Sequence, residues 1–78
     1  MAEAARAMNL PAMEPVTSSN ILRMGHDGQH AYCEFRNGGT WRYRDVSRPV
    51  YDEWKKSGSV GRYLAMFIKK NHTGEKLA

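Results

Sequence analysis

The sequence has few of the features that mark secreted, membrane-bound or metal-dependent proteins. It holds one cysteine, Cys33, in 78 residues, so no disulfide can form within the chain. No apolar run approaches the ~20 residues of a membrane-spanning helix. Residues 1–6 lack the basic start and the long apolar stretch of a secretory signal. These absences predict a cytoplasmic protein.

A chain this short has room for one small domain. Chains of this size bury only ~60–65% of their unfolded surface, which leaves little room for both a core and a walled pocket. We therefore expect no enzyme. Lysine and arginine outnumber aspartate and glutamate by 12 to 8, and 11 of the 12 basic residues follow residue 15. The positive excess thus belongs to the folded part of the chain.

Between Ser19 and Val46, apolar and polar residues alternate with the period of a half-buried strand. Three runs share this period: residues 20–25, 29–36 and 40–46. Asp27-Gly28 favours a two-residue turn between the first two runs, and Asn37-Gly38-Gly39 favours a three-residue loop between the last two. The pattern predicts a three-stranded antiparallel meander in the order 1-2-3.

The two turns also predict the register of the sheet. They place Met24 opposite Ala31 and Phe35 opposite Trp41. Both turns put the same seven side chains on one face: Leu22, Met24, Ala31, Cys33, Phe35, Trp41 and Tyr43. We expect this face to form one side of the core.

After Val46 the period becomes that of a helix. Ser47 can cap a first helix that ends at Gly58, and Ser59 can cap a second that ends near Asn71. The apolar stripes are Val50, Tyr51 and Trp54 in the first helix, and Val60, Tyr63, Leu64, Phe67 and Ile68 in the second. Because only the apolar face of the sheet can cover these stripes, the predicted fold is α+β, βββαα, with both helices on one face.

The flanks of this domain, which spans residues 16–73, read differently. Residues 1–15 contain two prolines and no sustained period, and they predict an N-terminal arm that is flexible or docks on a partner. Residues 74–78 predict a polar C-terminal tail.

Six short motifs follow one another along the predicted domain. They are Val16-Thr17-Ser18-Ser19-x-Ile21, Gly25-His26-Asp27, Ala31-x-Cys33-x-Phe35-x-Asn37-Gly38, Trp41-x-Tyr43, Val50-Tyr51 and Ser59-x-Gly61-x-Tyr63. In this order they resemble the KTSC domain family. The chain departs from the family pattern at Trp41, where the first tyrosine of a Tyr-x-Tyr hallmark is usual, and at His26 and Ser47, where tyrosine and proline are common.

The family is named for a module at the C-terminus of some lysyl-tRNA synthetases, and it includes small free-standing bacterial and phage proteins. Through the synthetase context, the resemblance implies RNA binding. It implies no catalytic residue in this chain.

The sheet face opposite the predicted core carries a candidate nucleic-acid site. The candidate residues are Arg23, Tyr32, Arg36, Arg42 and Arg44. Arginines neutralise phosphates, and an exposed aromatic ring stacks on bases of any sequence. The alternative is a solvated face, which an antiparallel sheet commonly has, or a face that binds a protein. Glu34 is also placed to pair with Arg23 or Arg42.

A second candidate is an anion site formed by Ser59, Gly61 and Arg62 at the start of the second helix. The alternative explanation for Gly61 is close packing of that helix. No histidine spacing matches a zinc signature, and Cys33 is expected to point into the core. We therefore predict no metal, no cofactor and no catalytic residue.

These observations predict a small non-enzymatic domain that binds RNA or another nucleic acid through its basic sheet face. The alternative is a protein-interaction module, such as a phage or prophage structural subunit that docks by residues 1–15 and is located in the virion. Salt distinguishes the two hypotheses, because binding to phosphates weakens steeply as the ionic strength rises.

Overall fold

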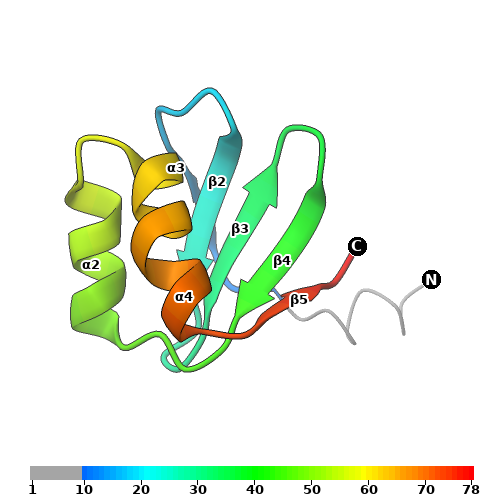
Figure 1. The fold of residues 1–78 in the computed structure, drawn as a ribbon. Coiled ribbons are helices and arrows are strands. Elements are labelled where there is room, and N and C mark those ends of the chain that lie inside the picture. The colour runs from blue at the N-terminus through cyan, green and yellow to red at the C-terminus, as the bar shows by residue number, and fades with distance from the viewer. Residues whose placement is uncertain (1–9) are drawn as a thin grey trace.

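The computed structural model describes residues 10–78, which form an antiparallel sheet with helices on one face (Figure 1). In this part of the chain the sheet has five strands in the order β1-β2-β3-β4-β5. The strands are β1 (Met13–Pro15), β2 (Ile21–His26), β3 (Ala31–Phe35), β4 (Gly39–Tyr43) and β5 (Gly74–Lys76). The helical segments are α2 (Arg48–Lys56), α3 (Val60–Tyr63), η1 (Leu64–Ile68) and α4 (Lys69–Asn71). The α+β class is confirmed, and the predicted sheet of three strands is wrong.

The two additional strands come from the flanks of the predicted domain. β1 pairs with β2, and β5 pairs with β4. Each has three residues, which is too short for a two-residue period to stand out. Residues 74–78 are therefore not a free tail, and Thr40 is bonded through its backbone to both Leu77 and Ala78. Of the predicted arm, residues 1–9 lie outside the described part of the chain.

The register differs from the predicted one by two residues at both hairpins. Met24 pairs with Cys33, not with Ala31, because the first loop has four residues, Asp27 to His30. The Asp27 carboxylate closes this loop by accepting the N–H groups of Gln29 and His30 at 2.9 and 2.7 Å. A shift of two residues leaves each side chain on its predicted face.

A bulge in β2 corrects the prediction for Leu22. The register shifts between Ile21 and Arg23, so that Leu22 has no partner on β3. Ile21 takes the place in the core that was expected for Leu22 and is fully buried, whereas Leu22 is half-buried. The bulge is the physical reason, because an extra residue reverses the alternation on one side of it.

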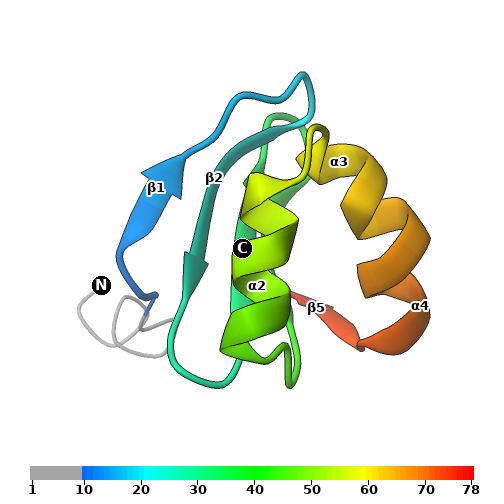
Figure 2. The same cartoon turned by 90° about the vertical axis from the view of Figure 1, so that its left-hand side faces the viewer.

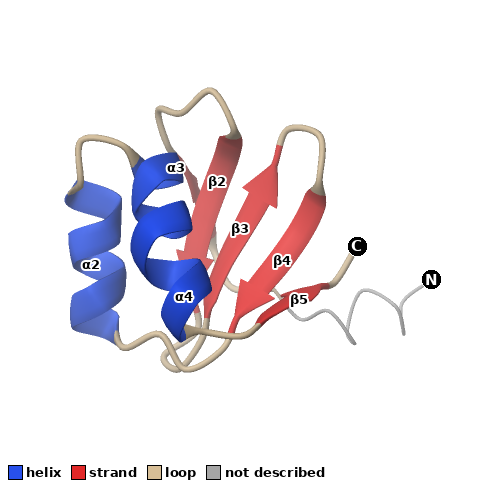
Figure 3. Cartoon of the chain, in the orientation of Figure 1, coloured by secondary structure: helices blue, strands red, loops and turns tan. Residues whose placement is uncertain are grey.

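The helices form a second layer over the sheet (Figures 2 and 3). Ser47 caps α2 by accepting the Val50 N–H, and Ser59 caps α3 by accepting the Arg62 N–H. α3, η1 and α4 follow without a break and form one helical run. In Figure 1 this run lies in front of β2 and β3, while β4 and β5 lie beside it. Within residues 10–78, no helix combines the length and the apolar character required to cross a membrane.

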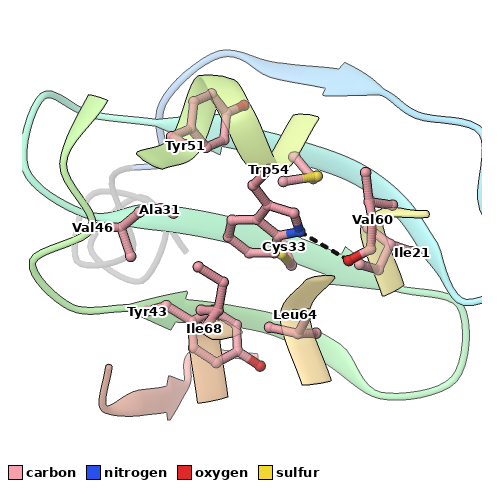
Figure 4. Packing of buried hydrophobic residues seen from close by; sticks show 11 residues of the cluster. Ile21, Ala31, Cys33, Tyr43, Val46, Tyr51, Trp54, Val60, Leu64 and Ile68 are labelled. Atoms are coloured by element: carbon pink, nitrogen blue, oxygen red, sulfur yellow. Dashed lines mark hydrogen bonds between the residues drawn. The ribbon is translucent and has the colours of Figure 1, made fainter. Parts of the chain in front are cut away.

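Trp54 occupies the centre of the core (Figure 4). Its indole N–H donates to the Val60 carbonyl at 2.9 Å, which ties α2 to the start of α3. Its ring meets Tyr43 and Tyr51 edge to face, at centroid distances of 6.2 and 6.4 Å. Edge-to-face pairs add stability beyond the area they bury. The Trp54 side chain thus connects α2, the start of α3 and the sheet.

Phe67 is 50% exposed, so its predicted place in the core is wrong. In a regular helix, Val60, Leu64 and Phe67 share one face, because residues i, i+4 and i+7 align. In η1, however, the Lys69 N–H donates to the Leu64 carbonyl, five residues back, and this is a π-turn. With the wider turn, Ile68 keeps its place in the core and Phe67 leaves it.

Candidate nucleic-acid interface

The sheet face turned away from the helices does not offer the exposed ring that the sequence predicts. Tyr32 is 2% exposed, and its hydroxyl donates to Asp27 at 2.7 Å. Gly25, the partner of Tyr32 on β2, lies under the chain that leads into β1. A Cβ on Gly25 would meet the Ala12 carbonyl oxygen and the Met13 sulfur, each at 2.7 Å. The N-terminal flank therefore covers this part of the face, and base stacking on Tyr32 is excluded in this arrangement.

The arginines of the same face are largely neutralised. Arg23 donates to Glu34 at 2.6 Å, which was one of the two predicted pairings. Arg42 and Arg44 both donate to Glu75 on β5, at distances of 2.6 to 3.1 Å. The hydrogen bond from Arg42 is the main cause that lowers the pKa of Glu75, which therefore remains charged at neutral pH. Three arginines facing two glutamates leave little net charge for phosphates.

The remaining predicted residues do not converge. Arg36 lies in the loop after β3 and donates to the Ser18 carbonyl at 3.2 Å. At the start of α3, the Ser59 hydroxyl itself takes the Arg62 N–H that an anion would need, and the Arg62 side chain points to Met66. A Cβ on Gly61 would meet no heavy atom closer than 3.9 Å, so close packing does not explain this glycine.

The structure contains a groove that the sequence did not predict. It lies on the helix side of the sheet, between α4 and the strands β4 and β5, and has a volume of about 500 Å³. We call it the helix-side groove; its lining residues are Asn20, Phe35, Asn37, Gly38, Trp41, Tyr43, Lys69, His72 and Gly74. Its lining residues come from β3, β4, β5 and α4 and from the adjoining loops.

The floor of the helix-side groove is aromatic. Phe35 and Trp41 are half-buried, although alternation predicts them in the core. The rings of Trp41 and Tyr43 lie nearly parallel, with centroids 6.4 Å apart. The Trp41 indole N–H donates to the Gly38 carbonyl at 2.9 Å, so its polar atom is satisfied without a ligand. A fixed ring with accessible surface is suited to stacking against a planar group.

The rim of the helix-side groove is polar and basic. Lys69 lines it from α4. Lys76 is the cross-strand partner of Trp41 and therefore leaves the sheet on the same side. His72 lines the groove as well, and its Nδ1 bonds to the Arg44 carbonyl at 3.0 Å. A carbonyl only accepts, so Nδ1 carries the proton and Nε2 of the neutral ring is an acceptor.

The charge of the helix-side groove is positive. Within residues 10–78 no carboxylate lines it. A flat ring can stack on the floor while an anionic group meets the lysines on the rim, and this combination suits a nucleotide.

The cysteine and the histidines add no site for chemistry in the described part of the chain. Cys33 is fully buried, and burial raises the pKa of its thiol, so the thiolate is disfavoured. Among residues 10–78, no group of three histidine, cysteine, aspartate or glutamate side chains is placed to hold a metal ion.

Comparison with known proteins gives one family and one fold. The sequence pattern of the KTSC domain matches residues 17–72, nearly the span covered by the six motifs. The fold is similar to the crystal structure of a KTSC domain protein from Yersinia pestis, with a TM-score of 0.81 and 29% sequence identity. That similarity covers 86% of this chain and 97% of the other. No curated protein matches the sequence.

Proposed function

Since the chain belongs to the KTSC domain family, we propose from its own surfaces that it is a small, non-enzymatic domain that binds single-stranded nucleic acid, preferably RNA, in the helix-side groove. One observation carries the proposal: the half-buried rings of Phe35 and Trp41 line the same groove as Lys69, and Lys76 is the cross-strand partner of Trp41. This replaces the sheet face as the proposed contact surface.

Two physical terms support this assignment. Stacking of a base on an aromatic side chain contributes ~1–3 kcal/mol and tolerates any base. Lysines near the backbone neutralise phosphates and release counterions, which makes the affinity depend on salt. A groove of about 500 Å³ is within the range of small-ligand sites, so it has room for a nucleotide.

Single strands are preferred over duplexes because of where the rings lie. Phe35 and Trp41 form the floor of a groove, and their faces can meet only a base that has left its helical stack. Paired bases in a duplex do not present their faces. A preference for RNA accords with the synthetase context of the family.

Fluorescence anisotropy of a labelled 12-nucleotide single-stranded RNA, measured at several salt concentrations, tests the proposal. Trp41→Ala should weaken binding by ~1–3 kcal/mol. Lys69→Ala with Lys76→Ala should also reduce the slope of log affinity against log salt, by ~0.7 for each lost phosphate contact.

Two further double variants serve as controls. Arg48→Ala with Lys56→Ala removes the same formal charge from exposed positions on α2, away from the groove. Arg42→Ala with Arg44→Ala removes it from the sheet face. Both should retain nearly the parent affinity. Equal losses from all the double variants would indicate diffuse attraction to a basic protein, and an absence of binding at moderate salt would refute the proposal.

A further inference from the structure

The helical run exposes an apolar patch that the core does not use. Phe67 is 50% exposed and Met66 45% exposed. Both border a cleft of about 340 Å³ beside the loop that joins α2 to α3. We call this surface the Phe67 cleft; it is lined by Ser57, Gly58, Ser59, Arg62, Tyr63, Met66 and Phe67. It lies apart from the helix-side groove and shares no lining residue with it.

The π-turn produces this patch, because a regular helix would bury Phe67 with Leu64. π-turns within helices occur frequently at functional sites. The exposed ring is also held in place: Phe67 lies against Tyr63 at a centroid distance of 4.9 Å, and Tyr63 stacks on the buried Trp54 at 6.4 Å. A ring fixed in this way loses little conformational entropy when a partner binds.

Basic residues outnumber acidic ones around the Phe67 cleft. Arg62 is its charged lining residue, and within residues 10–78 no carboxylate lines it. Lys56 ends α2 just before the loop, and Lys70 lies two turns after Arg62 on the helical run. Glu53 lies at the Tyr63 hydroxyl, where burial first and then this carboxylate raise the pKa of the phenol. The surface thus combines an apolar anchor point with a net positive charge, because Arg62, Lys56 and Lys70 outnumber Glu53.

We propose that the Phe67 cleft docks a peptide segment of a partner protein that carries a large apolar side chain flanked by aspartate or glutamate. The apolar side chain fills the cleft against Phe67 and Met66, and the acidic flanks meet Arg62 and the neighbouring lysines. This goes beyond nucleic-acid binding and uses a different surface.

Two other occupants fit less well. In a symmetric dimer the same patch faces itself, so Arg62 and Lys70 would oppose their own copies. A lipid surface requires a broad apolar face on the helix, whereas here two exposed apolar side chains border a concave cleft. Charge complementarity therefore favours the acidic peptide.

Selection of random 12-residue peptides displayed on phage, with the full chain immobilised, tests the proposal. Enriched peptides should combine a large apolar residue with net negative charge. A synthetic enriched peptide should bind Phe67→Ala on the order of tenfold more weakly than the parent. Arg62→Glu should also weaken binding of this peptide. A charge-reversed peptide, with lysine in place of each acidic residue, should not bind the parent protein.

Controls keep the outcome decisive. Phe67→Ala should retain the parent fold because the ring is half exposed, and Met66→Lys provides a second variant that blocks the cleft without removing the ring. Trp41→Ala should bind the peptide as the parent does, which separates this proposal from RNA binding. Enrichment without acidic character, or equal binding to Phe67→Ala and Met66→Lys, overturns the proposal. The proposal is also overturned if Phe67→Ala binds the peptide as the parent does but loses self-association. The same holds if the variant loses only the parent's sedimentation with phosphatidylcholine–phosphatidylserine vesicles.

Discussion

Trp41 on β4 lies directly opposite Lys76 on β5, so an aromatic ring and an ammonium group leave the edge of the sheet on the same side. The pairing depends on β5, a strand of three residues that follows the last helical segment. Lys69 approaches the same groove from α4. A sheet edge that is open beside the helices thus gathers stacking and phosphate-binding groups from three elements.

The two large aromatic residues of the helices should differ sharply in their effect on stability. Trp54→Ala should cost about 3–5 kcal/mol, because it empties the centre of the core. Phe67→Ala should cost about 1 kcal/mol, because half of its ring is already in water. Urea unfolding of the two variants provides the comparison. Equal losses would show that the π-turn does not expose Phe67 in solution.

Gly25 should be required for the docking of β1 over Tyr32. An alanine here places a methyl group where the Ala12 carbonyl oxygen and the Met13 sulfur lie, and backbone cannot easily give way. Gly25→Ala should therefore increase hydrogen exchange at the amides of Met13 and Glu14 and lower the melting temperature. Gly58→Ala is the matched control, because no heavy atom lies within 4 Å of the added Cβ. Unchanged exchange in Gly25→Ala would argue against the covered sheet face.

Asp27 should contribute stability that depends on pH. Burial acts to raise its pKa, but hydrogen bonds from the His30 and Gln29 N–H groups and the Tyr32 hydroxyl outweigh it and lower the pKa from 3.8 to about 2. The folded-state pKa lies below the unfolded one, so the contribution is present above pH ~4 and is lost as the pH falls towards 2. Asp27 is exposed, and screening limits the effect to about 1 kcal/mol.

Thermal unfolding of Asp27→Asn between pH 7 and pH 2 measures this contribution. The variant should melt below the parent at pH 7, and the difference should shrink towards pH 2. Asp52→Asn, which removes a surface carboxylate that pairs with Arg48 on α2, is the control and should show no comparable trend. A difference that stays constant across this range contradicts the assigned role of Asp27.

The central hairpins and the helices could be predicted because each carries a local signal. Alternation marks β2, β3 and β4, and Ser47 and Ser59 cap the helices as expected. The register could not be predicted, because it depends on loop lengths that side-chain contacts decide. The four-residue loop closed by Asp27 is the example, and its shift of two residues kept Met24 and Cys33 on the buried face.

The candidate site could be predicted only in part, for physical reasons. Alternation assigns Trp41 to the helix side of the sheet, but it does not reveal that the helices bury Tyr43 at the end of β4 and leave Trp41 half-buried. Glu75 neutralises Arg42 from a strand too short to show a period. The cover over Tyr32 comes from a flank with no regular pattern. Each of these features depends on contacts between distant parts of the chain.

The fluorescence of Trp41 tests the proposed function most directly. The chain has two tryptophans, and Trp54 is fully buried, so a response to ligand is expected from Trp41. Titration with unlabelled 12-nucleotide single-stranded RNA should quench the emission in step with binding measured by anisotropy. Trp41→Phe should retain most of the binding and lose the quenching. RNA binding by the parent that leaves the tryptophan emission unchanged would place the RNA elsewhere and contradict the assignment of the helix-side groove.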